Sequence, residues 1–526
     1  MEQLGLLFVV LFAAVLAEPL SRRIGLSSAV LMTVFGLVLA VLPFVPDISL
    51  EPHLILPLVL PPLLYAAARR TSWRQFVVNW AAITLRAVGL VLVTAAAVAA
   101  AFSLVHPAVP FAAAVALGAV VAPPDPIAAT AMASKLGLPR RLTSVLEGEG
   151  LFNDVTAIVV YSVAIEAVVS GHFSAWDAAW RFVVSAVVAV LVGGVFGWAS
   201  SRLVDRLDEA AWKVALTLLV PFAAYAVTEW LDASAVLAVL VCALYLTDAA
   251  TRTDDSGYRL VGDVFWEIIE LLVGGFAFGL IGLELSTVLR EAGASWPRML
   301  GGAVVVIVVV VALRLVWLLA TLRIFRTAHR DHLMDEPYTW KETVVTWWAG
   351  MRGVATVALA LALPLTVADG RPFPFRAEIL FTAFAVVLFT LLVQGPTLPL
   401  VVRWTGVHAD TAAERRMELD LWNRVLRAEL AELKRVSAAG DLPDDVYERL
   451  RTGLLQRLTH ADPQAADADE TESARRAWQR AGRFREIQRD VQAAGRREAL
   501  DARREPGVPP DVVDRVMRRL DFRAGP

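Results

Sequence analysis

The sequence contains 526 residues, of which 57% are hydrophobic, and its mean hydropathy is +0.58. A soluble globular protein is about 45–50% apolar, so this composition excludes an ordinary soluble fold and indicates a membrane protein. The net charge of -3 gives no indication of a nucleic-acid partner, and Cys242 alone allows neither an internal disulfide nor a cysteine metal site.

Residues 1–407 are poor in charge, and membrane spans are expected there. A helix needs about 20 apolar residues to cross the hydrocarbon core. The first segment lacks a basic n-region and contains Glu18-Pro19, so we interpret it as a span rather than a signal peptide. The apolar runs predict thirteen spans, at residues 3–20, 24–43, 54–68, 81–102, 108–132, 145–169, 181–200, 212–230, 233–249, 263–285, 297–322, 341–365 and 377–402.

The basic residues between the spans predict the orientation of the chain. With the N-terminus outside, the cytoplasmic loops hold seventeen Lys and Arg residues and the outer loops hold five. Cytoplasmic loops of membrane proteins carry such an excess. We therefore expect a multi-pass protein of the cell membrane with an outer N-terminus and a cytoplasmic C-terminal tail.

The predicted fifth span contains three prolines around an acid. Pro123, Pro124 and Pro126 cannot donate backbone hydrogen bonds, so a continuous helix is excluded there. Free backbone groups are tolerated at membrane depth only beside a cavity or inside the protein. We expect a broken helix with Asp125 in the break, facing the positive end of a half-helix. A simple proline kink, with Asp125 extending toward the cytosol, is the alternative.

The predicted sixth span carries an Asn-Asp pair near the middle of the bilayer. An ionisable residue at that depth costs several kcal/mol, so Asp154, beside Asn153, is a functional candidate by default. Gly150 shares a face with Asp154 and allows another backbone to approach. An acid near a helix start explains Glu147, but Asp154 lies two turns deeper.

The predicted eleventh and twelfth spans each contain an arginine. Arg352 lies in the sequence GMRG at 350–353, where the glycines indicate a second helix break or a close contact. We expect Arg352 to be a buried structural residue that neutralises half-helix ends and Asp125. Arg314 needs a buried anion, and Glu149 is its candidate partner.

The two interrupted spans, the fifth and the twelfth, lie seven spans apart. Interrupted helices at matching positions of two halves indicate the binding site of an inverted-repeat transporter. Spans one to six and eight to thirteen would be the repeats. The predicted fold is an all-α polytopic membrane protein with discontinuous crossing helices and a soluble helical tail.

The tail, residues 408–526, carries 23 basic and 23 acidic residues. Its clearest helical pattern is an apolar face formed by Leu421, Val425, Leu426, Leu430 and Leu433. A regulatory or dimer-supporting role and a solvated appendage are both compatible with this pattern.

Several ordered motifs in residues 1–405 resemble one known family. The sequence GEGLFND at 148–154 is similar to the E-S-L-x-N-D-x-x-A signature of the sodium/proton exchanger branch of the monovalent cation:proton antiporters, which includes bacterial Na+/H+ antiporters. The other similarities are PDP at 124–126 to the T-D-P break, GMRG at 350–353 to G-L-R-G, LPPLLY at 60–65 to L-P-P-L-L-F, and GLIGLE at 279–284 to a further family segment.

The resemblance implies a thirteen-helix fold with a core and a dimerisation domain, usually as a homodimer. It implies electroneutral exchange of Na+, often also Li+, for H+, with no cofactor. Asp154 would bind Na+ or the proton, and the Pro124 carbonyl would offer a ligand. Asn153 and Asp125 would hold the crossing helices, and Glu149 with Arg314 would form a structural ion pair.

The chain departs from the family pattern at three positions. Gly150 and Pro124 lack a hydroxyl that the family often has, and Ala66 stands where an acid often follows the L-P-P-L-L-F segment. A water or another carbonyl must then complete the shell of the ion, and the choice between Na+ and K+ stays open.

A buried carboxyl group would explain antiport in chemical terms. Burial disfavours the charged form of an acid, so such a group near neutral pH can hold either a proton or a cation. Exchange follows if the site opens alternately to each side. A K+/H+ antiporter is the nearest alternative and a cation channel another. The sequence has no G-x-S-x-G motif, His-rich cluster or P-loop that would favour an enzyme or an ATP-driven pump.

Overall fold

The computed structural model describes residues 2–24, 27–42, 52–70, 83–125, 136–171, 175–252, 256–292, 296–327, 339–409, 411–438 and 443–461. Across these ranges the regular structure is helical, with one isolated antiparallel bridge between Thr366 and Pro372. The chain divides into two compact units, Met1–Ala409 and Asp410–Pro526. Pro126 and the residues that follow it in the predicted fifth span, 127–132, lie outside the described residues.

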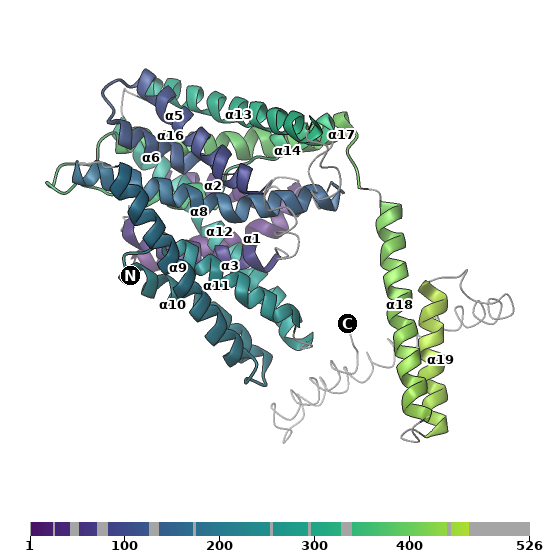
Figure 1. The fold of residues 1–526 in the computed structure, drawn as a ribbon. Coiled ribbons are helices and arrows are strands. Elements are labelled where there is room, and N and C mark those ends of the chain that lie inside the picture. Colours follow the sequence, from purple (N-terminus) through teal and green to yellow (C-terminus); the bar gives the residue numbers. More distant parts are fainter. Residues whose placement is uncertain are drawn as a thin grey trace, which may run out of the picture. The chain divides into compact units, whose positions relative to one another are not determined.

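The first unit is a bundle of helices (Figure 1). Their bounds are α1 (Glu2–Ile24), α2 (Ser28–Val41), α3 (Pro52–Arg70), α5 (Val91–Val105), α6 (Phe111–Val121), α8 (Arg140–Ser170), α9 (Ala175–Val204), α10 (Ala210–Trp230), α11 (Ala235–Arg252), α12 (Ser256–Ala292), α13 (Trp296–Thr327), α14 (Trp340–Trp348), α15 (Val354–Leu361), α16 (Arg376–Phe389) and α17 (Gly395–Thr405). Two π-helical segments, η1 (Leu85–Leu90) and η3 (Thr390–Gln394), continue directly into α5 and α17.

Each predicted span coincides with a described helix or with a set of consecutive helical segments. The twelfth span is the pair α14 and α15, and the thirteenth is α16, η3 and α17. Within the described ranges, eight helical stretches are long and apolar enough to cross a membrane, and α2, α6 and part of α11 are shorter apolar helices. The predicted all-α polytopic fold is therefore confirmed, while the number of thirteen spans stays a prediction.

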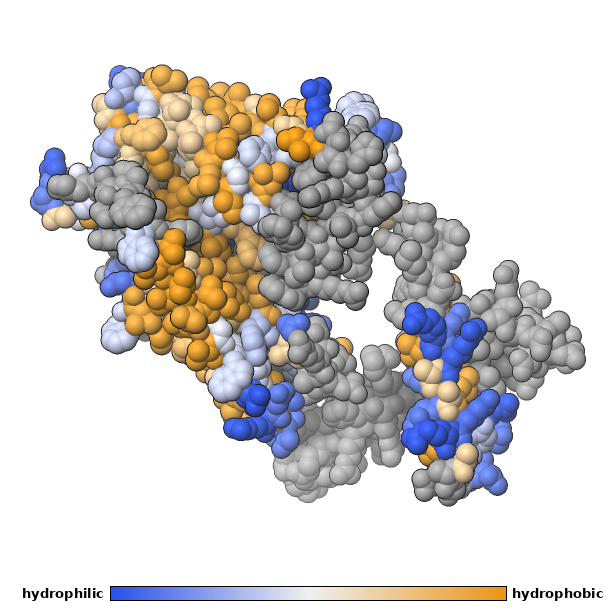
Figure 2. Space-filling model, in the orientation of Figure 1, coloured by the Kyte–Doolittle hydropathy of each residue, from blue (hydrophilic) through white to orange (hydrophobic). Residues whose placement is uncertain are grey.

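Hydrophobic side chains cover much of the visible face of this first unit (Figure 2). Large apolar residues such as Phe8, Leu104, Leu191 and Trp230 are exposed on its surface. Soluble monomeric proteins rarely expose a continuous apolar surface of this kind to water. Lipid chains, by contrast, are as apolar as the side chains themselves. The outer surface therefore fits contact with the hydrocarbon core of a bilayer.

Small residues allow the closest helix contacts in this unit. On α2, a side chain at Gly36 would collide with the backbone of Gly279 on α12, and Gly282 lies against the same stretch of α2. On α6, Gly118 lies directly against the backbone of Ala95 on α5. Such contacts are typical of membrane helices, where association depends on close packing rather than on the exclusion of water.

The second unit contains α18 (Thr411–Ala438) and α19 (Asp444–Ala461), which contact each other. On the predicted apolar face of α18, Leu426 is buried and Leu430 and Leu433 are partly exposed. Val425, by contrast, is exposed. Of this face, the structure therefore buries Leu426 and partly covers Leu430 and Leu433, and the side chain of Leu421 lies outside the described residues.

Candidate ion-binding site

The first element of the site is the break at the end of α6. This helix ends at Val121, and residues 122–125 are not helical. Pro123 and Pro124 explain the end, because neither can donate the next hydrogen bond of the helix. The break leaves residues 122–125 as non-helical backbone, largely buried in the bundle.

The second element is the interruption between α14 and α15. Helix α14 ends at Trp348 and α15 begins at Val354, with the GMRG sequence in the connection. The two interruptions meet at a crossing, where the Asp125 amide of the first donates a hydrogen bond to the Met351 carbonyl of the second at 2.5 Å. The backbone groups that each break sets free are thus partly satisfied by the other, as buried polar groups require.

Arg352 holds the carbonyl groups at this crossing. Its Nε atom donates to the Val121 carbonyl at 3.2 Å, and its Nη1 atom donates to the Gly350 carbonyl at 2.5 Å. Its own backbone amide donates to the Thr390 hydroxyl at 3.1 Å. A cation at the C-terminal end of a helix is favourable. The guanidinium group of Arg352 therefore contacts carbonyl groups of both breaks, and its predicted role in neutralising half-helix ends and Asp125 stays a prediction.

Asp125 lies at the end of the second interruption where α15 begins. A side chain at Gly353 would collide with the Asp125 carboxyl group, so the carboxylate rests directly against this glycine at the start of α15. The N-terminal end of a helix carries a partial positive charge, which stabilises an anion. The contact therefore ties the first break to the second through charge as well as through hydrogen bonds.

The Asn-Asp pair of α8 approaches the crossing from the side. Asn153 is fully buried, and its Nδ2 atom donates to the Pro124 carbonyl at 2.7 Å. Asp154 is partly exposed, and it faces a cavity of about 30 Å³. One volume of this size has room for a water or a small ion, since about 10–15 Å³ already accommodates a water.

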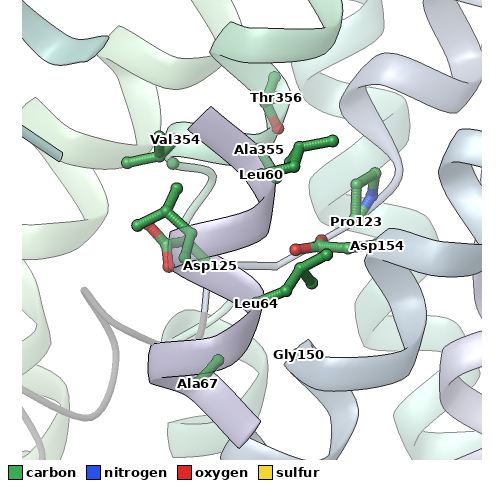
Figure 3. A pocket seen from close by; sticks show the side chains of 12 residues that line it. Leu60, Leu64, Ala67, Pro123, Asp125, Gly150, Asp154, Val354, Ala355 and Thr356 are labelled. Atoms are coloured by element: carbon green, nitrogen blue, oxygen red, sulfur yellow. The ribbon is translucent and has the colours of Figure 1, made fainter. Parts of the chain in front are cut away.

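The cavity lies between α3, α8 and the two breaks. Figure 3 shows the side chains of Asp125, Asp154 and Thr356 around it, together with leucines from α3. Leu60 and Leu64 form its apolar wall. In this wall of leucines, the carboxyl group of Asp154 is one of a small number of polar groups that an ion could contact.

A buried ion pair supports the site from behind. Arg314 on α13 donates to both carboxylate oxygens of Glu149 on α8, at 2.5 and 3.2 Å. Both side chains are only 2% exposed. The Arg314 side chain also lies over Gly350, where any larger residue would collide with it. The pair therefore fixes α8, α13 and the second break relative to one another.

The structure thus brings all of the sequence-selected residues to one crossing, in three groups. Asp125, Pro124 and the Asn153-Asp154 pair lie at the first break, Arg352 contacts both breaks, and Glu149 with Arg314 lies behind them. Sequence reasoning did not select Thr356 or Thr390. Thr356 follows the GMRG sequence by one helical turn, which is the signal that could have identified it.

Two interrupted helices that cross beside a partly exposed carboxyl group are typical of the binding site of a secondary membrane transporter. The family model described as "Sodium/hydrogen exchanger, transmembrane" matches residues 7–404. The chain therefore belongs to the sodium/hydrogen exchanger family, as the motif resemblance predicts.

Individual relatives extend over most of the chain. It is 33% identical to an uncharacterized Na+/H+ exchanger of Mycobacterium tuberculosis, with 90% of this chain and 88% of that protein covered. It is 32% identical to the low-affinity Na+/H+ antiporter NhaS1 of Synechocystis, with 84% and 82% covered. The solved structure of the sodium proton antiporter MjNhaP1 from Methanocaldococcus jannaschii has a TM-score of 0.61 at 18% identity, with 77% of this chain and 99% of that chain covered.

The similarity to the solved structure shows a shared antiporter fold, and the family match adds the class of activity. The chain is a multi-pass membrane transporter of the cation/proton antiporter class, and it is not an enzyme.

Proposed function

We propose that this chain exchanges Na+, and also Li+, for H+ across the cell membrane. The metal cation and the proton compete for Asp154. The supporting observation is the position of this carboxyl group. It faces a small cavity at the crossing of two interrupted helices, and leucines of α3 form the apolar wall opposite.

Competition follows from the chemistry of a carboxyl group in such a place. The ionised form is a ligand for a small cation, whereas the protonated form is neutral and holds a cation poorly. Poor solvation in a site walled by leucines disfavours an ionised carboxyl group that has no cation beside it. Asp154 therefore carries either a proton or a cation, and its exposure to each side in turn produces exchange.

The surroundings of Asp154 support an electroneutral exchange. Asn153 is a neutral amide, and its Nδ2 group is engaged by the Pro124 carbonyl. The Asp125 carboxylate lies against the start of α15. If Asp154 is the one group that changes its occupant, one Na+ moves for each H+, and no net charge crosses the membrane.

Na+ is the proposed ion because relatives such as NhaS1 are named for Na+/H+ exchange. We also propose an outer N-terminus, a cytoplasmic tail and a homodimer. The orientation is supported by basic residues such as Arg22 and Arg23 at the end of α1 and Arg69 near the end of α3, because cytoplasmic loops carry an excess of Lys and Arg.

The experiment is proton exchange in everted membrane vesicles that contain the full chain. Na+, Li+ and K+ are added in turn, and dissipation of a preformed pH gradient is followed. Na+ and Li+ are expected to release protons, and Asp154→Asn is expected to abolish the response. Asp369→Asn is the matched control, because Asp369 is an exposed acid that pairs with Arg371.

Three results would contradict the proposal in different ways. Normal exchange by Asp154→Asn would remove the role of that carboxyl group. A response to K+ that exceeds the response to Na+ would favour the K+/H+ alternative. A cation current without proton counter-flow would indicate a channel.

A further inference from the structure

We propose that the hydroxyl group of Thr356 is a ligand of the transported cation and strengthens the binding of Na+ without strengthening the binding of H+. This inference rests on the proposed exchange at Asp154 and identifies a second group in the same cavity. It starts from a polar atom for which the described residues offer no partner.

Thr356 is the third residue of α15, directly after the second interruption. Its side chain lines the cavity that Asp154 faces, and the residue is only 1% exposed. Figure 3 shows the Thr356 side chain at this cavity, which Asp154 enters from α8. Two different helices therefore bring oxygen atoms to one small volume.

The Thr356 oxygen is buried and has no hydrogen-bond partner among the described residues. Most threonines in buried helices avoid this state by donating to a carbonyl one turn earlier. In this chain the hydroxyls of Thr346, Thr217 and Thr390 do so, at 2.9, 2.7 and 2.9 Å. The carbonyl four residues before Thr356 belongs to Arg352, inside the interruption, and the carbonyl three residues before it belongs to Gly353 and accepts the Val357 amide.

A buried hydroxyl without a partner is unfavourable, so one facing a cavity indicates a missing partner in that cavity. The hydroxyl oxygen has two lone pairs, which suit a small hard cation. Among the described lining residues, the side chains that carry oxygen are those of Asp125, Asp154 and Thr356. The Asp125 carboxylate lies against Gly353, so Asp154 and Thr356 remain to contact an ion.

The other residues of the cavity make this hydroxyl more important. Pro123 and Gly150 line the cavity and bring no side-chain oxygen, and Leu63 on α3 is apolar. A cation that loses its water on entry needs oxygen ligands in exchange. A proton on Asp154 needs only the carboxylate. The Thr356 hydroxyl therefore contributes to the binding of Na+ and not to the binding of the proton.

The test compares substitutions of Thr356 in proteoliposomes that contain the purified full chain. Thr356→Val keeps the shape and removes the hydroxyl. Thr356→Ser keeps the hydroxyl, and Thr356→Ala removes it from the same small side chain. The measured quantities are the apparent KM for Na+ and for Li+ and the maximal rate, each at several pH values.

Removal of the hydroxyl is expected to raise the apparent KM for Na+ about tenfold, as for the loss of one bond to a charged group. Thr356→Ser is expected to stay near the wild type. The curve of KM against pH should move upward without a change in its midpoint, because the proton does not use this oxygen.

Thr382 on α16 (Arg376–Phe389) provides the matched control. Its hydroxyl is also buried without a partner among the described residues, and Thr382 is not a lining residue of the cavity. Thr382→Val should therefore leave the KM for Na+ unchanged. Size-exclusion profiles of all variants show whether each protein is folded.

Several outcomes would overturn the inference. One is an unchanged KM for Na+ in Thr356→Val and Thr356→Ala. Another is a rise of the KM in Thr356→Ser or in Thr382→Val as large as the rise in Thr356→Val. A third is a shift of the pH midpoint in Thr356→Val with no rise of the KM. The last result would mean that the hydroxyl acts on the proton of Asp154. Failure of Asp154→Asn to abolish exchange would instead contradict the proposed function itself.

Discussion

At the scale of single residues, the charges of the site are separated by role. Arg352 binds backbone carbonyls, and Arg314 is paired with Glu149. Asp154 faces the cavity from the same helix as Glu149, little more than one turn further along. The structural charges therefore contact fixed partners, and the carboxyl group proposed for transport borders an open volume.

The Glu149–Arg314 pair gives a prediction about stability. Removal of one partner leaves an uncompensated buried charge, which typically destabilises a protein by about 3–5 kcal/mol. Arg314→Met should therefore lower the unfolding temperature of the purified protein strongly. The double variant Glu149→Leu with Arg314→Met should recover much of the loss, because an apolar pair leaves no buried charge.

The measurement is thermal unfolding in detergent, followed by the loss of the monodisperse size-exclusion peak. The exposed pair of Arg435 and Glu432 provides the control, and Arg435→Met should change the unfolding temperature little. An unfolding temperature for Arg314→Met equal to that of the wild type would contradict a supporting role for the pair.

At the scale of elements, the two interruptions depend on one another. The first break supplies the Asp125 carboxylate to the start of α15, and the second supplies the Met351 carbonyl to the Asp125 amide. Neither contact survives if the helices move apart. The crossing is therefore one structural unit made from two distant parts of the sequence.

Gly353, like Gly350, is a position of this unit where an added side chain would collide with a neighbour. Gly353→Ala would place a methyl group into the Asp125 carboxyl group, so this carboxyl group must leave its position against α15 or the two breaks must separate. We expect Na+-dependent proton exchange to fall by at least about tenfold, since misplacement by about 1 Å can cost a hundredfold in activity. Gly194→Ala on α9 is the control, because a side chain there meets nothing within 4 Å.

Exchange is measured in the same vesicles after the amounts of protein are matched by immunoblot. Full activity of Gly353→Ala would show that the close contact with Asp125 is not needed for transport. A loss of activity in Gly194→Ala would instead point to a general sensitivity of the bundle to added methyl groups.

The helices and both interruptions could be predicted from the sequence, because the physical rules behind them are local. Pro123 and Pro124 lack donors wherever they occur, and a buried Arg314 needs an anion. Thr356 could not be selected in this way. Its hydroxyl matters through the crossing of α15 with α8 and α3, and the register of that crossing depends on contacts between distant helices.

The same limit applies to the surroundings of Arg352. The sequence predicts a buried arginine near half-helix ends, but it does not give the carbonyl groups that this arginine binds. The Val121 carbonyl and the Thr390 hydroxyl are far from it along the chain. Only the packed arrangement brings them within hydrogen-bond distance.

At the scale of the whole molecule, an apolar exterior surrounds an interior that contains polar groups. The first unit exposes large hydrophobic side chains, buries the Glu149–Arg314 ion pair and Arg352, and holds the carboxyl groups of Asp125 and Asp154 only partly exposed. This is the arrangement that a transporter needs, because lipid excludes ions everywhere except at the internal site. Exchange is then limited to ions that occupy that site.

Competition between Na+ and H+ for Asp154 is tested most directly by kinetics in proteoliposomes of the wild-type chain. The initial rate of proton flux is measured over a range of Na+ concentrations at several pH values. Competition predicts that, at pH values where the shared carboxyl group is mostly protonated, the apparent KM for Na+ rises in proportion to the proton concentration. The maximal rate should stay constant. A KM that does not change with pH, with a maximal rate that does, would contradict a shared carboxyl group.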